Sequence, residues 1–267
     1  MKKLISIAVL CGLFSVNAFA AQDNTYQHEA GLDYAANSED FGDGFWNLGY
    51  RYYVTPVAQD KVPYALSGFL AQSSNLGVHY ATDSGDANDY RVDGEYVMDS
   101  KWFIGASYSR LDTDFVDNNN YGLSLGYYFN DTSAVYANYS RSDTSWDAGF
   151  GYGGDVTRDQ YSAGIKSFLP LQTTSGVLLE ANIAHVAGSG GSQSTNGLNL
   201  SADWYVTQSW SVGANYSRDD NDFDSSEIRT AYFLRLTDQI SARAMVTKMI
   251  DPSGDGVGIT LGLNGRF

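Results

Sequence analysis

The chain has 267 residues, with 16 basic against 31 acidic side chains, one cysteine, 28 glycines and 20 tyrosines. So acidic a protein would repel nucleic acid, because binding it requires neutralising phosphates, and a single cysteine excludes a disulfide framework. Charged residues make up 18% of the chain, below the roughly 25% of ordinary soluble domains.

The first 20 residues have the three parts of a secretory signal peptide. Lys2 and Lys3 form the charged start, residues 4–14 are apolar, and small residues precede the expected cleavage point. The apolar stretch is too short to span a bilayer as a helix, which takes roughly 20 residues. We therefore expect 1–20 to be a cleaved leader and 21–267 to be one domain. Removing the leader leaves 247 residues without cysteine, with 14 basic against 31 acidic side chains.

Beyond the leader, apolar and polar residues alternate with period two, which predicts β-strands. In the segment 121–129, for example, Leu123 and Leu125 alternate with Gly122 and Ser124. About fourteen strands are predicted, near 26–36, 45–54, 63–73, 88–98, 102–111, 120–129, 133–142, 158–169, 176–187, 197–206, 210–218, 227–236, 240–249 and 257–267. No stretch keeps a 3.6-residue apolar period long enough to predict a helix.

Two kinds of connection separate these strands. Tight turns such as 99–100 and 130–132 alternate with longer, acidic, glycine-rich links such as 143–157 and 219–226. Short turns at one end, longer loops at the other and an even strand number are typical of a transmembrane β-barrel. The face opposite the apolar one is small and polar, so it lacks the bulk of a second packed layer. We predict an all-β fold, a transmembrane antiparallel up-and-down β-barrel of about 14 strands.

The last strand carries Leu261, Leu263 and the final aromatic residue Phe267 at alternate positions, although Gly265 departs from the pattern. With this last strand, the leader and the alternating strands, the chain resembles Gram-negative outer-membrane β-barrels over its whole mature length. More narrowly, the chain is similar to the general porins, which are small, acidic, cysteine-free barrels. The resemblance implies an outer-membrane location among lipid and lipopolysaccharide. It also implies that Leu261, Leu263 and Phe267 form an insertion signal for the barrel-assembly machinery.

Aromatic residues collect near the predicted strand ends, as expected for rings at headgroup depth. The loop-side belt would contain Tyr34, Trp46, Tyr90, Tyr108, Tyr121, Tyr139, Tyr161 and Tyr216. The turn-side belt would contain Tyr26, Tyr52, Tyr64, Tyr96, Trp102, Phe129, Trp204, Trp210 and Phe267. The β-propensity of aromatic residues is the alternative explanation.

Charges of both signs occupy positions that alternate with the apolar face. A Lys or Arg facing lipid near the midplane costs about 2–4 kcal/mol, so these side chains should face the interior. The predicted pore-lining residues are Glu29, Asp33, Arg51, Arg91, Asp93, Glu95, Lys166, Glu180, Asp203, Arg229, Arg235 and Arg243. Fourteen strands make a barrel wider than the eight-stranded kind whose side chains fill the interior, so we expect an open, water-filled channel. A lumen sealed by salt bridges is the alternative.

The arrangement of these charges is also predicted. The basic set Arg51, Arg229, Arg235 and Arg243 should oppose the acidic set Glu29, Asp33, Asp93 and Glu95 across the pore.

We expect no plug in the lumen, since no link between strands is long. The link 143–157, with Trp146, Phe150 and Tyr152, is the candidate for a partial gate, or else a mobile surface loop. The acidic excess at the mouth favours weak cation selectivity.

Arg110, Arg141 and Arg218 follow tyrosines in the repeated pattern A-x-Y-S-R-x-D and share the outward face. At the rim they would either contact lipopolysaccharide phosphates through charge-assisted hydrogen bonds or remain solvated.

The run 219–227 has alternate carboxylates, as a calcium site would. However, Ser225 stands where an EF-hand requires glycine, so diffuse divalent binding fits better. We predict no dedicated metal site and no cofactor.

The predicted function is passive diffusion of small hydrophilic solutes or ions through the lumen. Signals for catalysis are weak, because His28, His79 and His185 lie on separate segments and no G-x-S-x-G motif occurs. We therefore predict no catalytic residue and no nucleic-acid partner. The alternative is a non-conducting barrel that acts as an adhesin or structural anchor, with its loops as the working surface.

Overall fold

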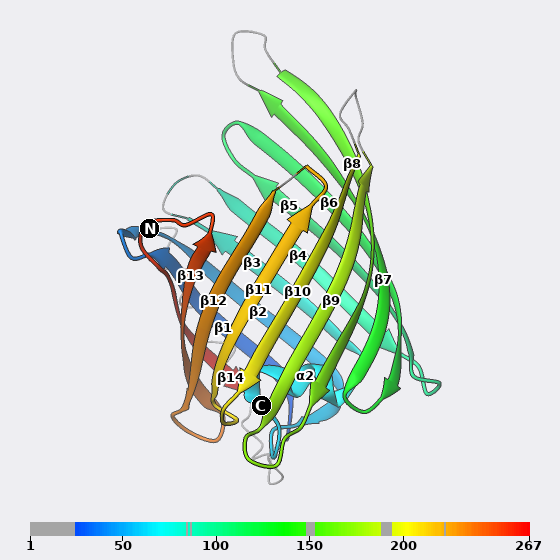
Figure 1. Ribbon diagram of the computed structural model, residues 1–267, viewed down its shortest axis with the longest axis vertical. Coiled ribbons are helices and arrows are strands. Elements are labelled where there is room, and N and C mark those ends of the chain that lie inside the picture. The colour runs from blue at the N-terminus through cyan, green and yellow to red at the C-terminus, as the bar shows by residue number, and fades with distance from the viewer. Residues whose placement is uncertain (1–24, 84, 86, 148–152, 188–193, 222) are drawn as a thin grey trace.

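The computed structural model describes residues 25–267 apart from 84, 86, 148–152, 188–193 and 222, so the predicted leader lies outside the described residues. Fourteen antiparallel strands form one closed barrel (Figure 1), which confirms the predicted fold class. The strands are β1 (Thr25–Asn37), β2 (Asp40–Ala58), β3 (Asn75–Thr82), β4 (Asn88–Val97), β5 (Trp102–Asp112), β6 (Val116–Asn130), β7 (Ser133–Asp147), β8 (Gly153–Leu169), β9 (Gly176–Ala187), β10 (Thr195–Tyr205), β11 (Trp210–Asp219), β12 (Asp224–Arg235), β13 (Ile240–Asp251) and β14 (Gly258–Arg266).

The alternation of side chains gives the barrel two different faces. On β6, Leu123 is 58% exposed on the outer face, while Ser124 lines an internal cavity. Because β14 pairs with β1, no strand edge of the barrel is left open, and the backbone groups of the wall bond to one another. Among the described residues, no helix is both long and apolar enough to cross a bilayer.

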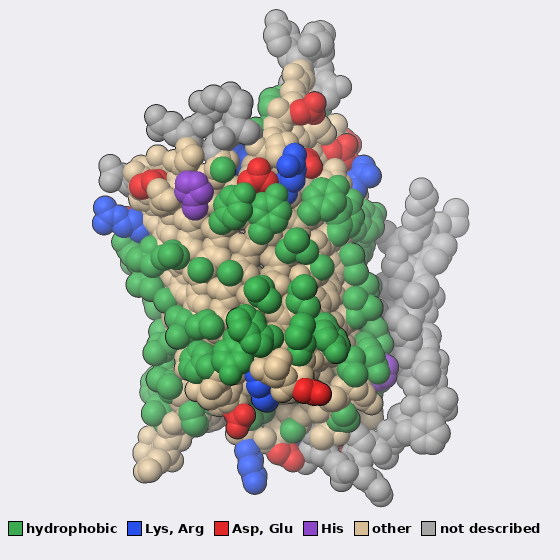
Figure 2. Space-filling view, turned by 90° about the vertical axis from the view of Figure 1, so that its right-hand side faces the viewer, with side chains coloured by type: hydrophobic (Ala, Val, Ile, Leu, Met, Phe, Trp, Pro, Cys, Tyr) green, Lys and Arg blue, Asp and Glu red, His purple; other side chains and the backbone are tan. Residues whose placement is uncertain are grey.

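The outer face carries a broad apolar band. Figure 2 shows hydrophobic side chains spread over this face and charged side chains near its two ends. Tyrosines pair across neighbouring strands on the loop side, with ring centroids 5.3 Å apart for Tyr108 and Tyr121 and 5.3 Å apart for Tyr139 and Tyr161. Rings so placed match the preference of amphipathic aromatics for the membrane interface.

One predicted strand is wrong. Residues 63–73 form no strand, and the third strand is instead Asn75–Thr82. The connection from β2 to β3, residues 59–74, contains the 3-10 turn η1 (Tyr64–Leu66) and the short helix α2 (Ser67–Ala71). Figure 1 shows α2 at the turn side of the barrel, and we call residues 59–74 the inward segment.

The inward segment forms the apolar core at the turn side of the lumen, so the expectation that nothing would plug the barrel is also wrong. Three clusters join it to strands around the wall. They are Leu66 and Leu70 with Phe168, Leu178 and Tyr205; Phe69 with Phe103, Tyr128 and Tyr136; and Ala71 with Tyr26, Tyr53 and Val57. Burying one large apolar side chain contributes about 1.5–3 kcal/mol, so these clusters fix the segment in place.

Two residues of the predicted turn-side belt lie inside the barrel. Tyr26 is 2% exposed, and its hydroxyl is hydrogen-bonded to Ser67 Oγ at 2.9 Å. A register shift between Tyr26 and His28 explains this, because a bulge reverses the face that the next residue presents. Tyr64 belongs to η1, with its ring 5.5 Å from the guanidinium carbon of Arg235.

The loop-side link predicted over 143–157 consists mostly of strand residues. Strands β7 and β8 take up most of 143–157, and their hairpin extends beyond the rest of the rim (Figure 1). Trp146 lies over Gly154, where an added Cβ would come within 2.6 Å of the indole ring. Phe150 and Tyr152 lie outside the described residues, so the gate hypothesis stays a prediction.

Replacing Leu123 by Arg should lower the free energy of unfolding by about 2–4 kcal/mol, because the guanidinium would face hydrocarbon. Urea unfolding from lipid vesicles measures this. The matched control is Ser124→Arg on the same strand, whose guanidinium would face the lumen and should cost clearly less. Equal losses in the two variants would contradict the assigned faces of β6.

Candidate functional site

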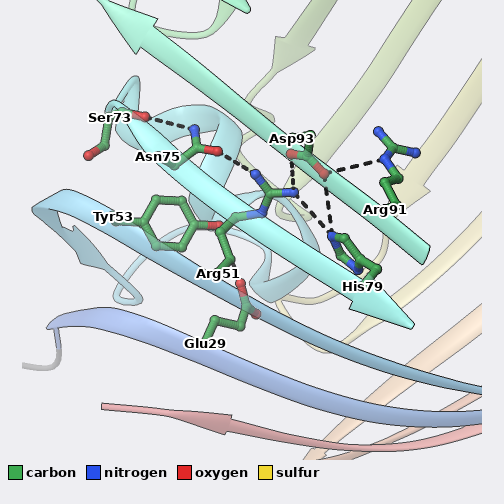
Figure 3. A network of polar contacts seen from close by, with 8 residues as sticks. All are labelled: Glu29, Arg51, Tyr53, Ser73, Asn75, His79, Arg91 and Asp93. Carbon is green, nitrogen blue, oxygen red and sulfur yellow. Dashed lines mark hydrogen bonds and ion pairs between the residues drawn. The ribbon is translucent and has the colours of Figure 1, made fainter. Parts of the chain in front are cut away.

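Asp93 of β4 is the centre of a polar network on the lumenal wall (Figure 3). Arg51 Nη2 donates to its Oδ2 at 2.7 Å, and Arg91 Nε and His79 Nε2 lie 3.3 and 3.5 Å from its Oδ1. Arg51 lies close against β3 because Gly77 has no side chain; an added Cβ would be 2.8 Å from Nη2. Two arginines therefore compensate one carboxylate at this place.

The same network holds the C-terminal end of the inward segment. Arg51 Nη1 donates to Asn75 Oδ1, and Asn75 Nδ2 donates to the carbonyl oxygen of Ser73 at 3.0 Å. Ser73 Oγ accepts from the backbone N–H of Thr55 at 3.0 Å. Figure 3 shows this continuous path from Ser73 through Asn75 and Arg51 to Asp93.

Arg266 of β14 holds the other end of the segment. Its Nη2 lies 2.8 Å from Glu29 Oε1 and donates to the carbonyl oxygen of Tyr64 at 2.9 Å. Its guanidinium carbon lies 4.8 Å from the ring centroid of Tyr26. The backbone N–H of Tyr64 donates to the carbonyl oxygen of Gln208 at 3.0 Å. The inward segment is thus bonded to strands or turns on several sides of the lumen.

Most other lumenal charges pair along the wall rather than across it. Arg243 lies 2.9 Å from Asp33, and Arg229 lies 2.7 Å from Asp203. The expected opposition of the basic and acidic sets across the pore is therefore wrong. Barrel closure brings β13 close to β1, since Arg243 and Asp33 both stand opposite Gly262 of the intervening β14. Glycine there leaves room for the two side chains to meet.

Arg235, Lys166 and Glu180 have looser ion pairs. Arg235 lies 3.4 Å from Asp238 in the turn after its own strand. Lys166 Nζ lies 3.9 Å from Glu180 and 4.9 Å from the ring centroid of Phe69. Tyr136 donates a 2.6 Å hydrogen bond to Glu180, which reduces what this carboxylate offers the lysine.

Glu95 differs from the other predicted lumenal carboxylates. It accepts a hydrogen bond from the Tyr128 hydroxyl at 3.3 Å. Among the described residues, no basic group lies within 4.0 Å of it. Its negative charge is therefore the least compensated of the predicted set.

Two neighbouring cavities of about 570 and 460 Å³ extend from the inward segment toward the loop side. Both are lined by Phe69, Glu95, Ser124, Tyr128 and Asn138, so they lie side by side, and we call the two together the vestibule. Phe69 comes from the inward segment and forms the floor. The wall carries hydroxyls, amides and charges, so the vestibule is a polar chamber with an aromatic floor.

The three rim arginines share one kind of surrounding. Arg110 lies 3.1 Å from Asp117, Arg141 lies 3.3 Å from Asp143, and Arg218 lies 3.6 Å from Asp224; all are largely exposed. Each of these arginines thus lies beside a carboxylate, which comes from the neighbouring strand for Arg110 and Arg218 and from the repeat itself for Arg141. Contact with lipopolysaccharide stays a prediction.

His185 lies in a short polar chain at the loop side. Its Nδ1 is 2.8 Å from Asn196 Oδ1, and Asn196 Nδ2 donates to Asp220 at 2.7 Å. The hydrogen bond from Asn196 holds the pKa of Asp220 below its usual range. His79 lies elsewhere, in the Asp93 network, so the structure does not bring these histidines together.

The predicted insertion residues lie on the strand that closes the barrel. Leu261 and Leu263 are exposed on the outer face and stand opposite Tyr34 and Leu32 of β1. Phe267 exchanges backbone hydrogen bonds with His28 at 2.7 and 2.9 Å, and their rings are stacked at 5.5 Å. The final residue therefore contributes to the seam between the two ends of the chain.

Sequence reasoning missed Phe69, Tyr128 and His79 as lumenal residues. Tyr128 is detectable from the alternation in β6, because its neighbour Phe129 is predicted to face outward and adjacent side chains of a strand point to opposite faces. Leu66, Phe69 and Leu70 have the i, i+3, i+4 spacing of a helix face, although the predicted strand 63–73 includes all three.

Comparison with known proteins gives the following matches. The family described as "Putative general bacterial porin" matches residues 1–144. The outer membrane protein Omp33 of Acinetobacter baumannii is 22% identical, with a TM-score of 0.63 over 92% of this chain and 100% of that chain. CdiB of Acinetobacter baumannii is 9% identical, with a TM-score of 0.54 over 93% of this chain and 61% of that chain. The toluene transporter TbuX of Ralstonia pickettii is 11% identical, with a TM-score of 0.51 over 91% and 90%. No curated protein matches the sequence.

Replacing Arg51 by Met should loosen the C-terminal end of the inward segment, because Asn75 would lose its charged donor. Losing a hydrogen bond to a charged group costs about 1.5–3 kcal/mol, so amide hydrogen exchange at residues 72–76 should become roughly tenfold faster or more. Mass spectrometry after deuterium labelling measures this. The matched control is Arg229→Met, which breaks a similar ion pair elsewhere. Equal protection in both variants would show that Arg51 does not hold the segment.

Proposed function

The chain belongs to the general bacterial porin family, and we propose that it lets small hydrophilic solutes and ions diffuse passively across the outer membrane. The single observation that carries this proposal is the vestibule, a polar chamber inside a barrel whose outer face is apolar. A barrel that only anchored its loops could fill its lumen with side chains, whereas this lumen retains cavities of about 570 and 460 Å³. Membership of a porin family favours a channel over an enzyme, and we assign no catalytic role to His79 or His185.

The inward segment sets the size of the solute that can pass. It contacts the wall through Leu66, Phe69 and Ala71 on three sides, so the path narrows at the turn side of the vestibule. We expect low conductance, and the passage of ions and small solutes rather than large ones.

We propose weak cation selectivity on the basis of uncompensated negative charge. The mature chain would carry 31 acidic against 14 basic side chains, once Lys2 and Lys3 are removed with the leader. Most lumenal charges are paired and their fields largely cancel, whereas Glu95 has no such partner among the described residues. An unpaired carboxylate in a narrow polar space raises the local cation concentration.

The remaining predictions belong to the same proposal. Residues 1–20 would direct export and be removed, and residues 21–267 would form the barrel. Arg110, Arg141 and Arg218 would contact lipopolysaccharide at the rim. Leu261, Leu263 and Phe267 would be recognised by the assembly machinery.

The second candidate is a non-conducting adhesin or structural anchor. The inward segment favours it, because this segment is bonded to the wall at Tyr64, by Arg266, and at Ser73, by the backbone N–H of Thr55. Single-channel recording in a planar bilayer with a KCl gradient separates the two candidates. Discrete, reproducible conductance steps are expected for the porin. A silent bilayer, with heat-modifiable folded protein proven in it, would favour the anchor.

Replacing Glu95 by Gln should shift the reversal potential toward zero, because the lumen loses its least compensated carboxylate. The control is Asp99→Asn, which removes one negative charge from a turn outside the lumen and should change the reversal potential little. A Glu95→Gln channel with the wild-type reversal potential would remove this residue from the selectivity argument.

Replacing residues 60–73 by a short Asn-Gly turn should raise the single-channel conductance severalfold, because the obstruction at the turn side is gone. Phe69→Ala should give a smaller increase in conductance, and it tests the same prediction if the deletion variant does not fold. The control shortens the turn 170–175 between β8 and β9. Wild-type conductance in both inward-segment variants would show that the narrowest point lies elsewhere.

A further inference from the structure

The charges that border the vestibule differ in how well they are compensated. Asp93 has two arginines beside it, at 2.7 and 3.3 Å. Glu95 has no basic group within 4.0 Å among the described residues and accepts only a 3.3 Å hydrogen bond from Tyr128. Lys166 has one carboxylate, Glu180, at 3.9 Å. The vestibule therefore offers one carboxylate and one ammonium group that can each take a better partner.

These two groups both lie near the aromatic floor. The Tyr128 ring, whose hydroxyl bonds Glu95, lies 6.0 Å from the ring of Phe69. Lys166 Nζ lies 4.9 Å from the centroid of the same Phe69 ring. Glu95, Phe69 and Lys166 all line the smaller cavity. A contact path Glu95–Tyr128–Phe69–Lys166 thus puts a negative and a positive group around one small space.

The rest of this cavity is suited to a polar molecule. Ser124, Asn138, Asn182 and Asn199 line it with neutral donors and acceptors. Such groups can bond a solute without adding a net charge that would attract or repel it. The described charged groups of the cavity are Glu95, Lys166 and Glu180, and Glu180 already accepts a 2.6 Å hydrogen bond from Tyr136. The charge that a solute can still pair with is therefore supplied mainly by Glu95 and Lys166.

We infer that the vestibule binds small zwitterionic solutes of the α-amino-acid type, with the ammonium group at Glu95 and the carboxylate at Lys166. A simple cation would meet Lys166 and a simple anion would meet Glu95, so each would leave one charge poorly paired. A zwitterion pairs both, and specificity follows from this difference. The inference rests on the proposed channel, because it names the class of solute that the channel would hold.

Saturation-transfer NMR with the purified protein in detergent micelles tests this without requiring conduction. The probes are L-alanine, protonated L-alaninamide and propionate, which are similar in size and differ in charge. Wild-type protein should bind L-alanine at least about tenfold more tightly than either singly charged probe, since each charge-assisted hydrogen bond is worth about that factor.

Two variants assign the charges. Glu95→Gln should weaken L-alanine and L-alaninamide about tenfold and leave propionate unchanged, whereas Lys166→Gln should weaken L-alanine and propionate and leave L-alaninamide unchanged. The control Glu227→Gln changes a lumenal carboxylate that pairs with Arg229 and should bind all three probes like wild type. Heat-modifiable gel migration confirms folding of each variant.

The result separates the inference from the proposed channel. Equal affinity for the three probes, or no saturable L-alanine binding by folded protein, would overturn the inference even if the bilayer conducts. Selective binding lost in Glu95→Gln would support it even if the bilayer is silent, and would then leave the porin function without support.

Discussion

The structure depends first on the need to pair every backbone N–H and C=O group in a medium that offers no water. Helices satisfy this need within one segment, but a chain with period-two alternation and 28 glycines is not built for long helices. Its strands must bond to one another, and the sheet must close. Closure then assigns each residue to lipid or to lumen by parity alone, so that the polar half of the alternation lines the lumen.

The paired charges follow from the same geometry. Strands about 4.8 Å apart bring side chains of neighbouring positions into contact on the inner wall. A glycine between two charged residues, such as Gly262 between Arg243 and Asp33, leaves the space in which they meet. Since removing a charge from water is costly unless it is paired, contact along the wall is favoured over separation across the lumen. The field inside the barrel then depends on the few groups left uncompensated.

Sequence patterns predicted the barrel because parity repeats over every strand, so one misjudged segment does not change the architecture. They failed where the repeat is interrupted. The pattern predicts a strand over 63–73, because the helical spacing there covers little more than one turn and so short a helical period is hard to distinguish from alternation. Alternation predicts Tyr26 on the outer face, because nothing in the sequence marks the bulge between Tyr26 and His28. Ion pairs such as Arg51 with Asp93 depend on the register between neighbouring strands. The alternation of apolar and polar residues does not predict that register.

The seam of the barrel has a consequence for the order of assembly. Tyr26 on β1 is bonded to Ser67, while Arg266 on β14 is bonded both to Glu29 of β1 and to Tyr64. The first and last strands are therefore joined to each other and to the inward segment by one shared set of side chains. Pairing of β1 with β14 and placement of the inward segment therefore become one cooperative step, because each depends on side chains that also take part in the other. A barrel that closed before the inward segment was in place would lack the contacts of Tyr26 with Ser67 and of Arg266 with Tyr64.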